Sequence, residues 1–317
     1  MSEYFVLGPL SSVRCETVDN DEYWYQILHK LGRGGSSKTY LAVCTDPRER
    51  KGELVAIKFF VRYSKPERMA NFKREFDFLS ECTHPSIMRV HHIGEYEELV
   101  DRPFIVAEYL PNTLREAMRK DELSKMDKAR YATQLCSALH YLHSLDSPII
   151  HRDIKPENIF IREKGAVLGD FGLIKRFGGT PETEEERLEM FKESPGLGFP
   201  LRYRTPDQVA YLKGEAELTP ASDVFQLGLV LAELFTGWNP LKAPPITEGR
   251  PDWTAPVQLY PVKKIRGTQG LNILRVLKTM LRMEPEMRPS PGSLADRWEM
   301  LFKEIVRVTG RLEGWEF

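Results

Sequence analysis

The stretch Ile149–Leu173 reads IIHRDIKPENIFIREKGAVLGDFGL, and its polar residues stand at fixed places between apolar segments. Asp153 can accept a proton from a hydroxyl group, whereas Asn158 and Asp170 offer hard oxygen ligands that suit Mg²⁺ better than a soft metal. A base beside a pair of magnesium ligands is what phosphoryl transfer requires, because that reaction depends on positioning and charge neutralisation more than on covalent chemistry. The stretch therefore indicates a site for phosphoryl transfer.

The surrounding sequence predicts how this site is held. Apolar residues at helical spacing over Ala132–His143 predict a buried helix. The polar run that follows is typical of a loop, in which Pro156 prevents a helix from continuing. Two short strands, Ile159–Ile161 and Ala166–Leu168, are predicted around a turn at Lys164–Gly165. Catalytic groups commonly lie on loops that rigid elements position, so this arrangement agrees with a site.

Further motifs extend the pattern over nearly the whole chain. HRD at His151–Asp153 or DFG at Asp170–Gly172 alone would be a weak signal, but both occur in order, with Lys155 and Asn158 at the expected offsets. The other motifs are LGRGG at Leu31–Gly35, VAIK at Val55–Lys58, FKREFDFL at Phe72–Leu79, SDVFQLG at Ser222–Gly228 and MRPS at Met287–Ser290. From about Tyr25 to Val308 the chain resembles the eukaryotic-type (Hanks-type) protein kinases of the serine/threonine branch.

The resemblance implies an α+β fold with two lobes, a small β-rich N-lobe with one key helix and a larger α-helical C-lobe. It divides the chain into an N-terminal extension over residues 1–22 and a protein kinase domain over residues 23–317. Within the domain, the N-lobe covers about 23–107, the hinge 108–111 and the C-lobe about 112–317. The extension is expected to be either a disordered tail or a strand packed on the small lobe.

Composition narrows the range of partners. A chain of 317 residues with 41% hydrophobic content is large enough for two lobes with a full core. Its net charge of −1 gives no basic field for nucleic acid, and no apolar run approaches the roughly 20 residues of a membrane span. The cysteines, Cys15, Cys44, Cys82 and Cys136, show no CxxC pairing and are expected to be free thiols. We therefore expect a cytoplasmic protein without a nucleic-acid partner or membrane span.

The resemblance also implies a site for ATP. Phe72, Phe76 and Leu79 form the apolar face of a helix predicted over Phe72–Leu79, which carries Glu75. Lys58 is expected to contact the α- and β-phosphates and to pair with Glu75, since Glu67 lies near the start of this helix and Glu81 near its end. The glycine-rich segment at Gly32–Gly35 is expected to form a lid over the phosphates. Ser37 stands where the family has its third glycine and Thr39 where it has a valine, which predicts a looser and more polar lid. The nucleotide-binding residues that the resemblance implies are Gly32, Arg33, Gly34, Gly35, Thr39, Ala56, Lys58, Ala107, Glu108, Leu110 and Phe160.

Ala107 takes the gatekeeper position, where most members of the family have a bulkier residue. Two outcomes stay open: the small side chain opens a pocket behind the adenine, or neighbouring side chains fill the space.

The strongly apolar segment Ala221–Phe235 predicts the central buried helix of the C-lobe. A buried Asp223 would be costly without hydrogen bonds, and the resemblance implies that it binds backbone N–H groups of the catalytic loop. A cap of the helix by Ser222 or Asp223 is compatible with that role. Asp207 and Arg288 are expected to form a structural ion pair, although aspartate is shorter than the family's usual glutamate.

The segment Asp170–Asp207 departs most from the family pattern. It contains the acidic run PETEEERLEMFKE at Pro181–Glu193, and Phe199–Pro200 replaces the usual Gly-Thr before Tyr203. In such kinases a phosphate often neutralises the arginine at Arg152, and Thr180, Thr183 and Ser194 are candidate acceptors. Alternatively, glutamate carboxylates take the part of the phosphate, or the run is a solvated insertion.

Taken together, the motifs predict a serine/threonine protein kinase that transfers the γ-phosphoryl group of ATP to serine or threonine hydroxyls of a protein substrate and to itself. Asp153, Lys155, Lys58 and Glu75 are the expected catalytic residues, and Asn158 and Asp170 are expected to bind Mg²⁺, with Mn²⁺ as an alternative. Two rivals stay open, a small-molecule or lipid kinase and a non-catalytic pseudokinase scaffold. A scaffold predicts loss of Lys58, Asp153 or Asp170, and all of these are present.

Overall fold

The computed structural model of the chain describes residues 7–9, 11–16, 22–33, 37–46, 51–60, 77–96, 102–171, 174–178, 184, 187, 202–267 and 269–312. These residues form two compact units. The first contains the described residues up to Thr83 together with Ile87–Pro111, and the second contains His84–Ser86 and the described residues from Asn112 onward.

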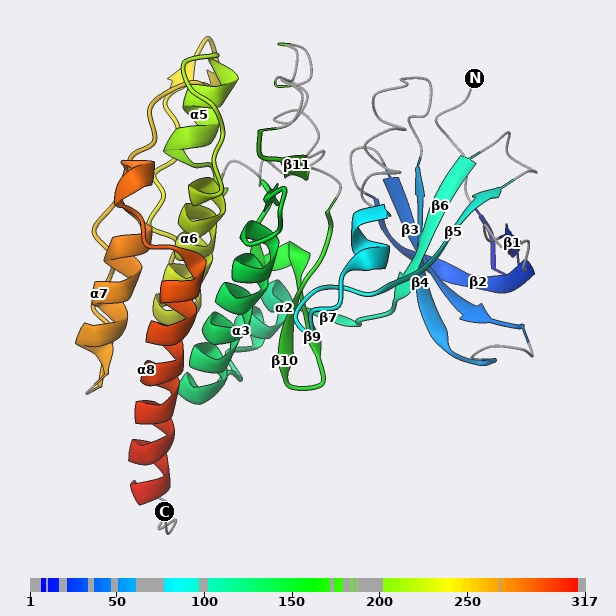
Figure 1. The fold of residues 1–317 in the computed structure, drawn as a ribbon, viewed down its shortest axis with the longest axis horizontal. Helices are drawn as coiled ribbons and strands as arrows, with labels where there is room; N and C mark the ends of the chain where they lie inside the picture. The colour runs from blue at the N-terminus through cyan, green and yellow to red at the C-terminus, as the bar shows by residue number, and fades with distance from the viewer. Residues whose placement is uncertain are drawn as a thin grey trace. The chain divides into compact units, whose positions relative to one another are not determined.

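The first unit is built on a six-stranded antiparallel sheet with the strand order β1-β2-β3-β4-β6-β5 (Figure 1). The two edge strands, β1 and β5, lie close to each other, so the sheet is curled. Residues 77–81 are helical and form the described end of the helix expected over Phe72–Leu79. The strands are β1 Ser12–Glu16, β2 Glu22–Arg33, β3 Ser37–Cys44, β4 Leu54–Phe60, β5 Val90–Tyr96 and β6 Arg102–Glu108.

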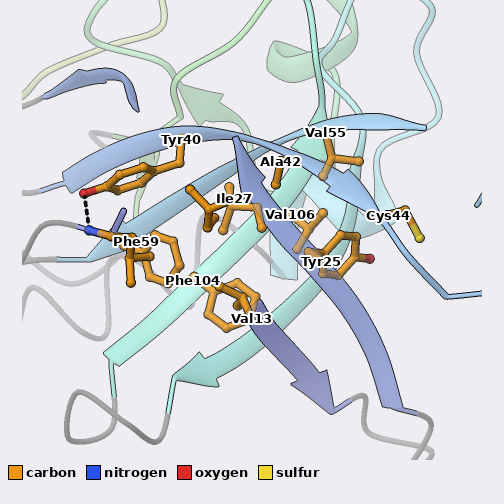
Figure 2. Packing of buried hydrophobic residues seen from close by; sticks show 12 residues of the cluster. Val13, Tyr25, Ile27, Tyr40, Ala42, Cys44, Val55, Phe59, Phe104 and Val106 are labelled. Atoms are coloured by element: carbon orange, nitrogen blue, oxygen red, sulfur yellow. Dashed lines mark hydrogen bonds between the residues drawn. The ribbon is translucent and has the colours of Figure 1, made fainter. Parts of the chain in front are cut away.

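The apolar core of this unit lies on one face of the sheet, because alternate strand residues point to the same side. Figure 2 shows its members, which include Val13, Tyr25, Ile27, Tyr40, Phe59, Phe104 and Val106. The segment before residue 23 contributes the buried Val13 on β1 and the buried Leu7, whose backbone N–H donates to the Tyr40 hydroxyl at 3.3 Å. Of the two expectations for the extension, a strand packed on the small lobe is therefore found for Ser12–Glu16.

The second unit is mainly helical. Its helices are α2 Leu114–Lys120, α3 Lys125–His143, α5 Pro206–Leu212, α6 Ala221–Thr236, α7 Gly270–Met280 and α8 Pro291–Leu312. Its 3₁₀ turns are η2 Pro156–Asn158 and η4 Pro285–Met287. Its short strands are β7 Asn112–Thr113, β8 Ile149–Ile150, β9 Ile159–Arg162, β10 Gly165–Leu168, β11 Lys175–Arg176, β12 Ile246–Thr247 and β13 Arg250–Pro251. None of the helices in the described ranges is long and apolar enough to cross a membrane.

Two long helices give this unit its frame, and both confirm the sequence prediction. α3 begins with a capping box of Ser124 and Asp127, buries apolar residues along one face and packs lengthwise on α8 (Figure 1). α6 is buried at every residue from 222 to 232, as its continuous apolar sequence predicts. The expected cap by Ser222 or Asp223 is not found, because α6 begins after Pro220 without a side-chain cap.

The β9–β10 hairpin corrects one detail of the prediction. Its turn lies at Glu163–Lys164, with Glu163 in the left-handed region at φ 52°, and not at Lys164–Gly165. Gly165 belongs to β10, where it faces the side chain of Gln134 on α3. A Cβ atom at Gly165 would lie 3.2 Å from Gln134 Nε2, and Gln134 Oε1 accepts from the Ala166 N–H at 2.9 Å. The glycine thus serves the close approach of hairpin and helix.

Candidate active site

The loop that carries Asp153 is tied to the first turn of α6 by Asp223. The Asp223 side chain is fully buried, and its carboxylate accepts from the backbone N–H groups of His151 and Arg152, each at 2.9 Å. A third nitrogen, Nε2 of His143 on α3, lies 2.9 Å from the same carboxylate. Three partners compensate for the burial of the charge, which would otherwise be costly. The predicted contact between Asp223 and the catalytic-loop backbone is confirmed.

Arg152 has a left-handed backbone with φ 71°, which is strained for a residue with a side chain. Its carbonyl oxygen accepts from Nε2 of Gln208 at 2.7 Å and from Nε2 of Gln226 at 2.9 Å. Oε1 of Gln226 also accepts from the N–H of Ile154 at 3.0 Å. Sequence reasoning missed both glutamines. The available signal was the position of Gln226 three residues after Asp223, on the same side of a helix.

His151 is held as a neutral imidazole. It is fully buried, and this burial lowers its pKa, although the charges of Asp223, Asp153 and Asp170 act in the opposite direction. Its partners assign the tautomer: Nε2–H donates to the Gly169 carbonyl at 3.1 Å, and Nδ1 accepts from the Asp153 N–H at 3.3 Å. The ring also contacts that of Phe171 with centroids 4.7 Å apart. His151 therefore links the backbone of Asp153 to the segment before Asp170.

The expected base, Asp153, lies in a compact polar cluster. Its Oδ2 atom accepts from Nζ of Lys155 at 2.8 Å and from Nδ2 of Asn158 at 2.9 Å, and Nδ2 also donates to the Asp153 carbonyl at 2.9 Å. Burial would lower the pKa of Lys155, but Asp153, Asp170 and Glu157 outweigh it and raise that pKa. Lys155 is therefore a permanent cation beside the carboxylate. The structure brings together the predicted Asp153, Lys155 and Asn158.

The donor chemistry of Asn158 and Asp170 fits a divalent cation. The hydrogen bonds of the Asn158 amide to Asp153 are made by its nitrogen, so the amide oxygen remains for a metal ion. Asp170 is exposed, adopts φ 57° and lies close enough for its charge to raise the pKa of Lys155. Within the described ranges, no three His, Cys, Asp or Glu side chains gather into a metal site. A set of two oxygen ligands suits Mg²⁺, which usually keeps several waters or phosphate oxygens.

A second network, which sequence reasoning missed, surrounds the loop. Arg115 on α2 donates to Glu157 at 2.7 Å, to Glu233 on α6 at 2.7 Å and to the Tyr203 hydroxyl at 2.6 Å, and that hydroxyl donates to Glu233. Burial and the charge of Glu233 raise the pKa of Tyr203, so its hydroxyl keeps its proton. The network joins η2, α2, α6 and the residues before α5. Nothing in the sequence near Arg115 marks this role.

The predicted ion pair between Arg288 and Asp207 is confirmed. Nη1 of Arg288 lies 2.7 Å from Oδ2 of Asp207, and both side chains are buried. The guanidinium also donates to the carbonyl groups of Ala221, Arg282 and Met283 at 2.8–2.9 Å. The pair therefore joins the starts of α5 and α6 to the turn before α8 and has a structural role.

In the first unit, strand register aligns several expected nucleotide residues. Gly32 pairs with Thr39 and Thr39 with Lys58, which places these residues in one row across β2, β3 and β4. In the next row, Ala56 pairs with Ala107. Strand alternation places both rows on the face opposite Tyr40, Ile57 and Phe59 of the core.

Glu108 ends β6 beside Val55, and its carboxylate accepts from the Arg89 N–H at 2.8 Å. Leu110 lies in the segment after β6, whereas Phe160 lies on β9 of the second unit, between Thr113 and Val167. The remaining predicted residues lie outside the described ranges: Gly34, Gly35, Glu67, Glu75, Gly172, Thr180, Thr183, Ser194, Phe199, Pro200 and the side chain of Arg33.

Comparison with known proteins identifies the class of protein that this fold and site define. The family described as "Protein kinase domain" matches residues 25–298. The chain belongs to the protein kinase family, whose members use ATP and a divalent metal ion.

Three relatives illustrate this membership. The chain is 31% identical over 221 residues to the probable serine/threonine-protein kinase PknB of Lactococcus lactis, with coverage of 68% of this chain and 32% of the relative. It is 29% identical over 273 residues to the serine/threonine-protein kinase PknD of Protochlamydia amoebophila, with coverage of 76% and 26%. It is 32% identical over 250 residues to the calmodulin-binding receptor-like cytoplasmic kinase 3 of Arabidopsis thaliana, with coverage of 77% and 45%. The chain thus spans less than half the length of these relatives.

Proposed function

We propose that the chain is an ATP-dependent serine/threonine protein kinase, which transfers the γ-phosphoryl group of ATP to a serine or threonine hydroxyl of a protein and also phosphorylates itself. The observation that carries this proposal is the cluster in which Lys155 and Asn158 both donate to one oxygen of Asp153. The cluster holds a carboxylate in a fixed position on a loop that Asp223 anchors. We assign the kinase domain to residues 23–317.

The residues of the second unit divide the chemistry among them. Asp153 orients the substrate hydroxyl and accepts its proton as the bond to phosphorus forms. Lys155, a permanent cation beside Asp153, stabilises negative charge on the transferred group. Asn158 and Asp170 would hold Mg²⁺, which when bound neutralises charge on the phosphates. His151 and Asp223 touch no substrate in this scheme and keep the loop in place.

The first unit supplies the contacts to the nucleotide in this proposal. Lys58 holds the α- and β-phosphates and is positioned by Glu75, while Gly32–Gly35 cover them with backbone N–H groups. The alignment of Gly32, Thr39 and Lys58 in one row of the sheet supports these roles. Glu108 and Leu110 would meet the adenine, with Ala56 and Ala107 beside them in the same unit, and the resemblance adds Phe160 as a further nucleotide-binding residue.

A protein substrate is favoured over a small molecule. Relatives that align with more than two thirds of this chain carry the name serine/threonine-protein kinase. Lys155 stands at the position that is typical of the serine/threonine branch of the family. A scaffold without activity is disfavoured because Lys58, Asp153 and Asp170 are retained. Within the described residues, Cys44, Cys82 and Cys136 form no disulfide, which supports a reducing compartment and hence the cytoplasm.

Transfer of radiolabelled phosphate from ATP tests the proposal. The full chain is incubated with ATP and Mg²⁺, with and without a generic basic protein, and the labelled residues are identified after hydrolysis. We expect phosphoserine and phosphothreonine, and near loss of label in Asp153→Ala and Lys58→Met. Lys30→Met is the matched control, because Lys30 is an exposed lysine of the same sheet. No labelled protein with Mg²⁺ or Mn²⁺ in the wild type would refute the proposal.

A further inference from the structure

A cavity of about 370 Å³ opens in the second unit, within the size range of ligand sites. It lies between the first turn of α3, the end of α6 and the segment before α7. The polar part of its lining includes the cations Lys125, Lys128, Lys264 and Arg266, and none of the described residues that line it is acidic. We call this cavity the basic pocket.

The positive charge of the basic pocket is not neutralised locally. Within the described residues, none of its four cations forms an ion pair with a carboxylate. Asp127, which is close in sequence, pairs instead with Arg130. The chain as a whole is balanced, with 45 Lys and Arg against 46 Asp and Glu, so the cluster does not reflect a generally basic protein. The N-terminus of α3 adds partial positive charge, and the C-terminus of α6, which also lines the pocket, adds partial negative charge, so the net positive charge comes from the four side chains.

The walls of the pocket are held in place. Nζ of Lys125 donates to the Arg266 carbonyl at 3.0 Å, which ties α3 to the segment before α7. The Phe235 ring, part of the lining, stacks on Trp298 with centroids 5.4 Å apart and planes inclined by 10°. Ile265 is buried, and Gly270 packs so closely on it that a Cβ atom there would lie 2.1 Å from the Ile265 carbonyl oxygen. The pocket therefore has one anchored cation, Lys125, and an apolar floor, while Lys264 and Arg266 are exposed and can turn toward a ligand.

We propose that the basic pocket binds the phosphate group of a phosphorylated serine or threonine in a protein segment, with an adjacent apolar side chain against Phe235 and Ile265. A phosphate monoester carries about −1.5 to −2 charges at neutral pH and three acceptor oxygens, so a single group pairs with several cations. A carboxylate carries only one negative charge and two acceptor oxygens. The apolar floor favours a ligand with a hydrocarbon part over a free inorganic anion.

The source of the phosphate group rests on the proposed function, because that activity produces phosphoserine and phosphothreonine in proteins. The basic pocket would then recognise substrates that already carry one phosphate, or the products of transfer. Binding itself needs neither ATP nor Asp153 and can be measured separately from transfer.

Fluorescence anisotropy with the full chain tests the proposal. The probes are a labelled peptide pool with a fixed central phosphoserine and mixed flanking residues, and the same pool with serine. We expect the phosphorylated pool to bind about tenfold more tightly or better, as charge-assisted hydrogen bonds allow. The double variant Lys128→Glu and Lys264→Glu should lose this preference. The double variant Lys278→Glu and Lys303→Glu, with the same change in charge at exposed sites, should keep it.

Three results would overturn the proposal: equal binding of the two pools, a preference that survives Lys128→Glu with Lys264→Glu, or inorganic phosphate that binds as tightly as the phosphorylated pool. Thermal unfolding of each variant checks the fold, and Lys264→Ala, at an exposed lysine, provides a milder change if the double variant is unstable. Transfer to an unphosphorylated protein should be unchanged in the pocket variants. Absence of transfer in the wild type would count against the proposed function and leave the binding result intact.

Discussion

Replacing Asp223 by asparagine tests how the loop around Asp153 is held. The substitution keeps the shape of the side chain but removes its charge and one of its acceptor oxygens. In the wild type, Oδ2 accepts from His151 N–H and Oδ1 from Arg152 N–H, each at 2.9 Å. The asparagine oxygen can serve one of these N–H groups, and the NH₂ group then faces the other as a second donor. One backbone N–H group of the loop is left buried without an acceptor.

The magnitude follows from these contacts. A hydrogen bond to a charged group contributes about 1.5–3 kcal/mol, and a buried unsatisfied donor costs about 1–3 kcal/mol. We therefore expect the free energy of unfolding to fall by about 2–4 kcal/mol. The substitution should also affect catalysis. The left-handed backbone of Arg152 at φ 71° is strained and persists only while hydrogen bonds such as those to Asp223 hold it. A small displacement of Asp153 should lower kcat by roughly 10²-fold.

Urea unfolding and steady-state phosphoryl transfer measure the two effects on one preparation. Hydrogen exchange at the amides of His151 and Arg152 locates the change. Asp296→Asn is the matched control, since Asp296 is exposed on α8 and should alter neither quantity. A variant Asp223→Asn that stays within about 0.5 kcal/mol of the wild type, with protected amides and full activity, would refute the anchoring role.

Three further predictions follow from the described contacts. Arg288→Ala should lower the free energy of unfolding by about 3–5 kcal/mol, because it leaves the Asp207 carboxylate buried without its partner; thermodynamic unfolding measures this, and loss of activity without loss of stability would contradict it. Burial lowers the pKa of His151 in the folded chain. Below pH 6.5, the ordinary pKa of histidine, the unfolded chain therefore binds more protons than the folded chain. The contribution of His151 to stability is present above pH 6.5 and should be lost as the pH falls toward the lowered pKa. In the His151→Gln variant, the free energy of unfolding should depend less steeply on pH, by at most about 1.4 kcal/mol per pH unit, as urea titrations at several pH values can measure. A pH dependence as steep as that of the wild type would argue against a neutral buried imidazole. Val13→Ala should cost roughly 1–2 kcal/mol because Val13 is fully buried in the sheet core, whereas the exposed Ser12→Ala should be neutral; equal stability of the two would show that β1 is dispensable.

Local signals in the sequence were sufficient to predict much of the fold and the cluster on the loop that carries Asp153. α6 has a continuous apolar sequence, and the apolar residues of α3 recur at helical spacing, so in both helices the pattern of apolar residues predicts which positions are buried. Asp153, Lys155 and Asn158 are separated by at most five residues, so their convergence depends mainly on local chain geometry.

Contacts between distant segments could not be predicted in the same way. Arg115 and Glu233 are 118 residues apart, and their contact depends on how α2 and α6 pack. Gly165 was assigned to a turn because glycine favours turns, yet it is needed where β10 approaches Gln134 on α3. A close approach of two elements leaves no periodic pattern in the sequence, which is why Gln208 and Gln226 also escaped detection.

The rate of a single turnover of phosphoryl transfer in Asp153→Asn tests the central claim most directly. With ATP, Mg²⁺ and a protein acceptor in excess over their dissociation constants, the measured rate reports chemistry and not binding. Loss of the base should lower this rate by about 10²–10⁴-fold while ATP affinity stays near that of the wild type. A rate equal to that of the wild type would contradict the assignment of Asp153 as the group that receives the proton.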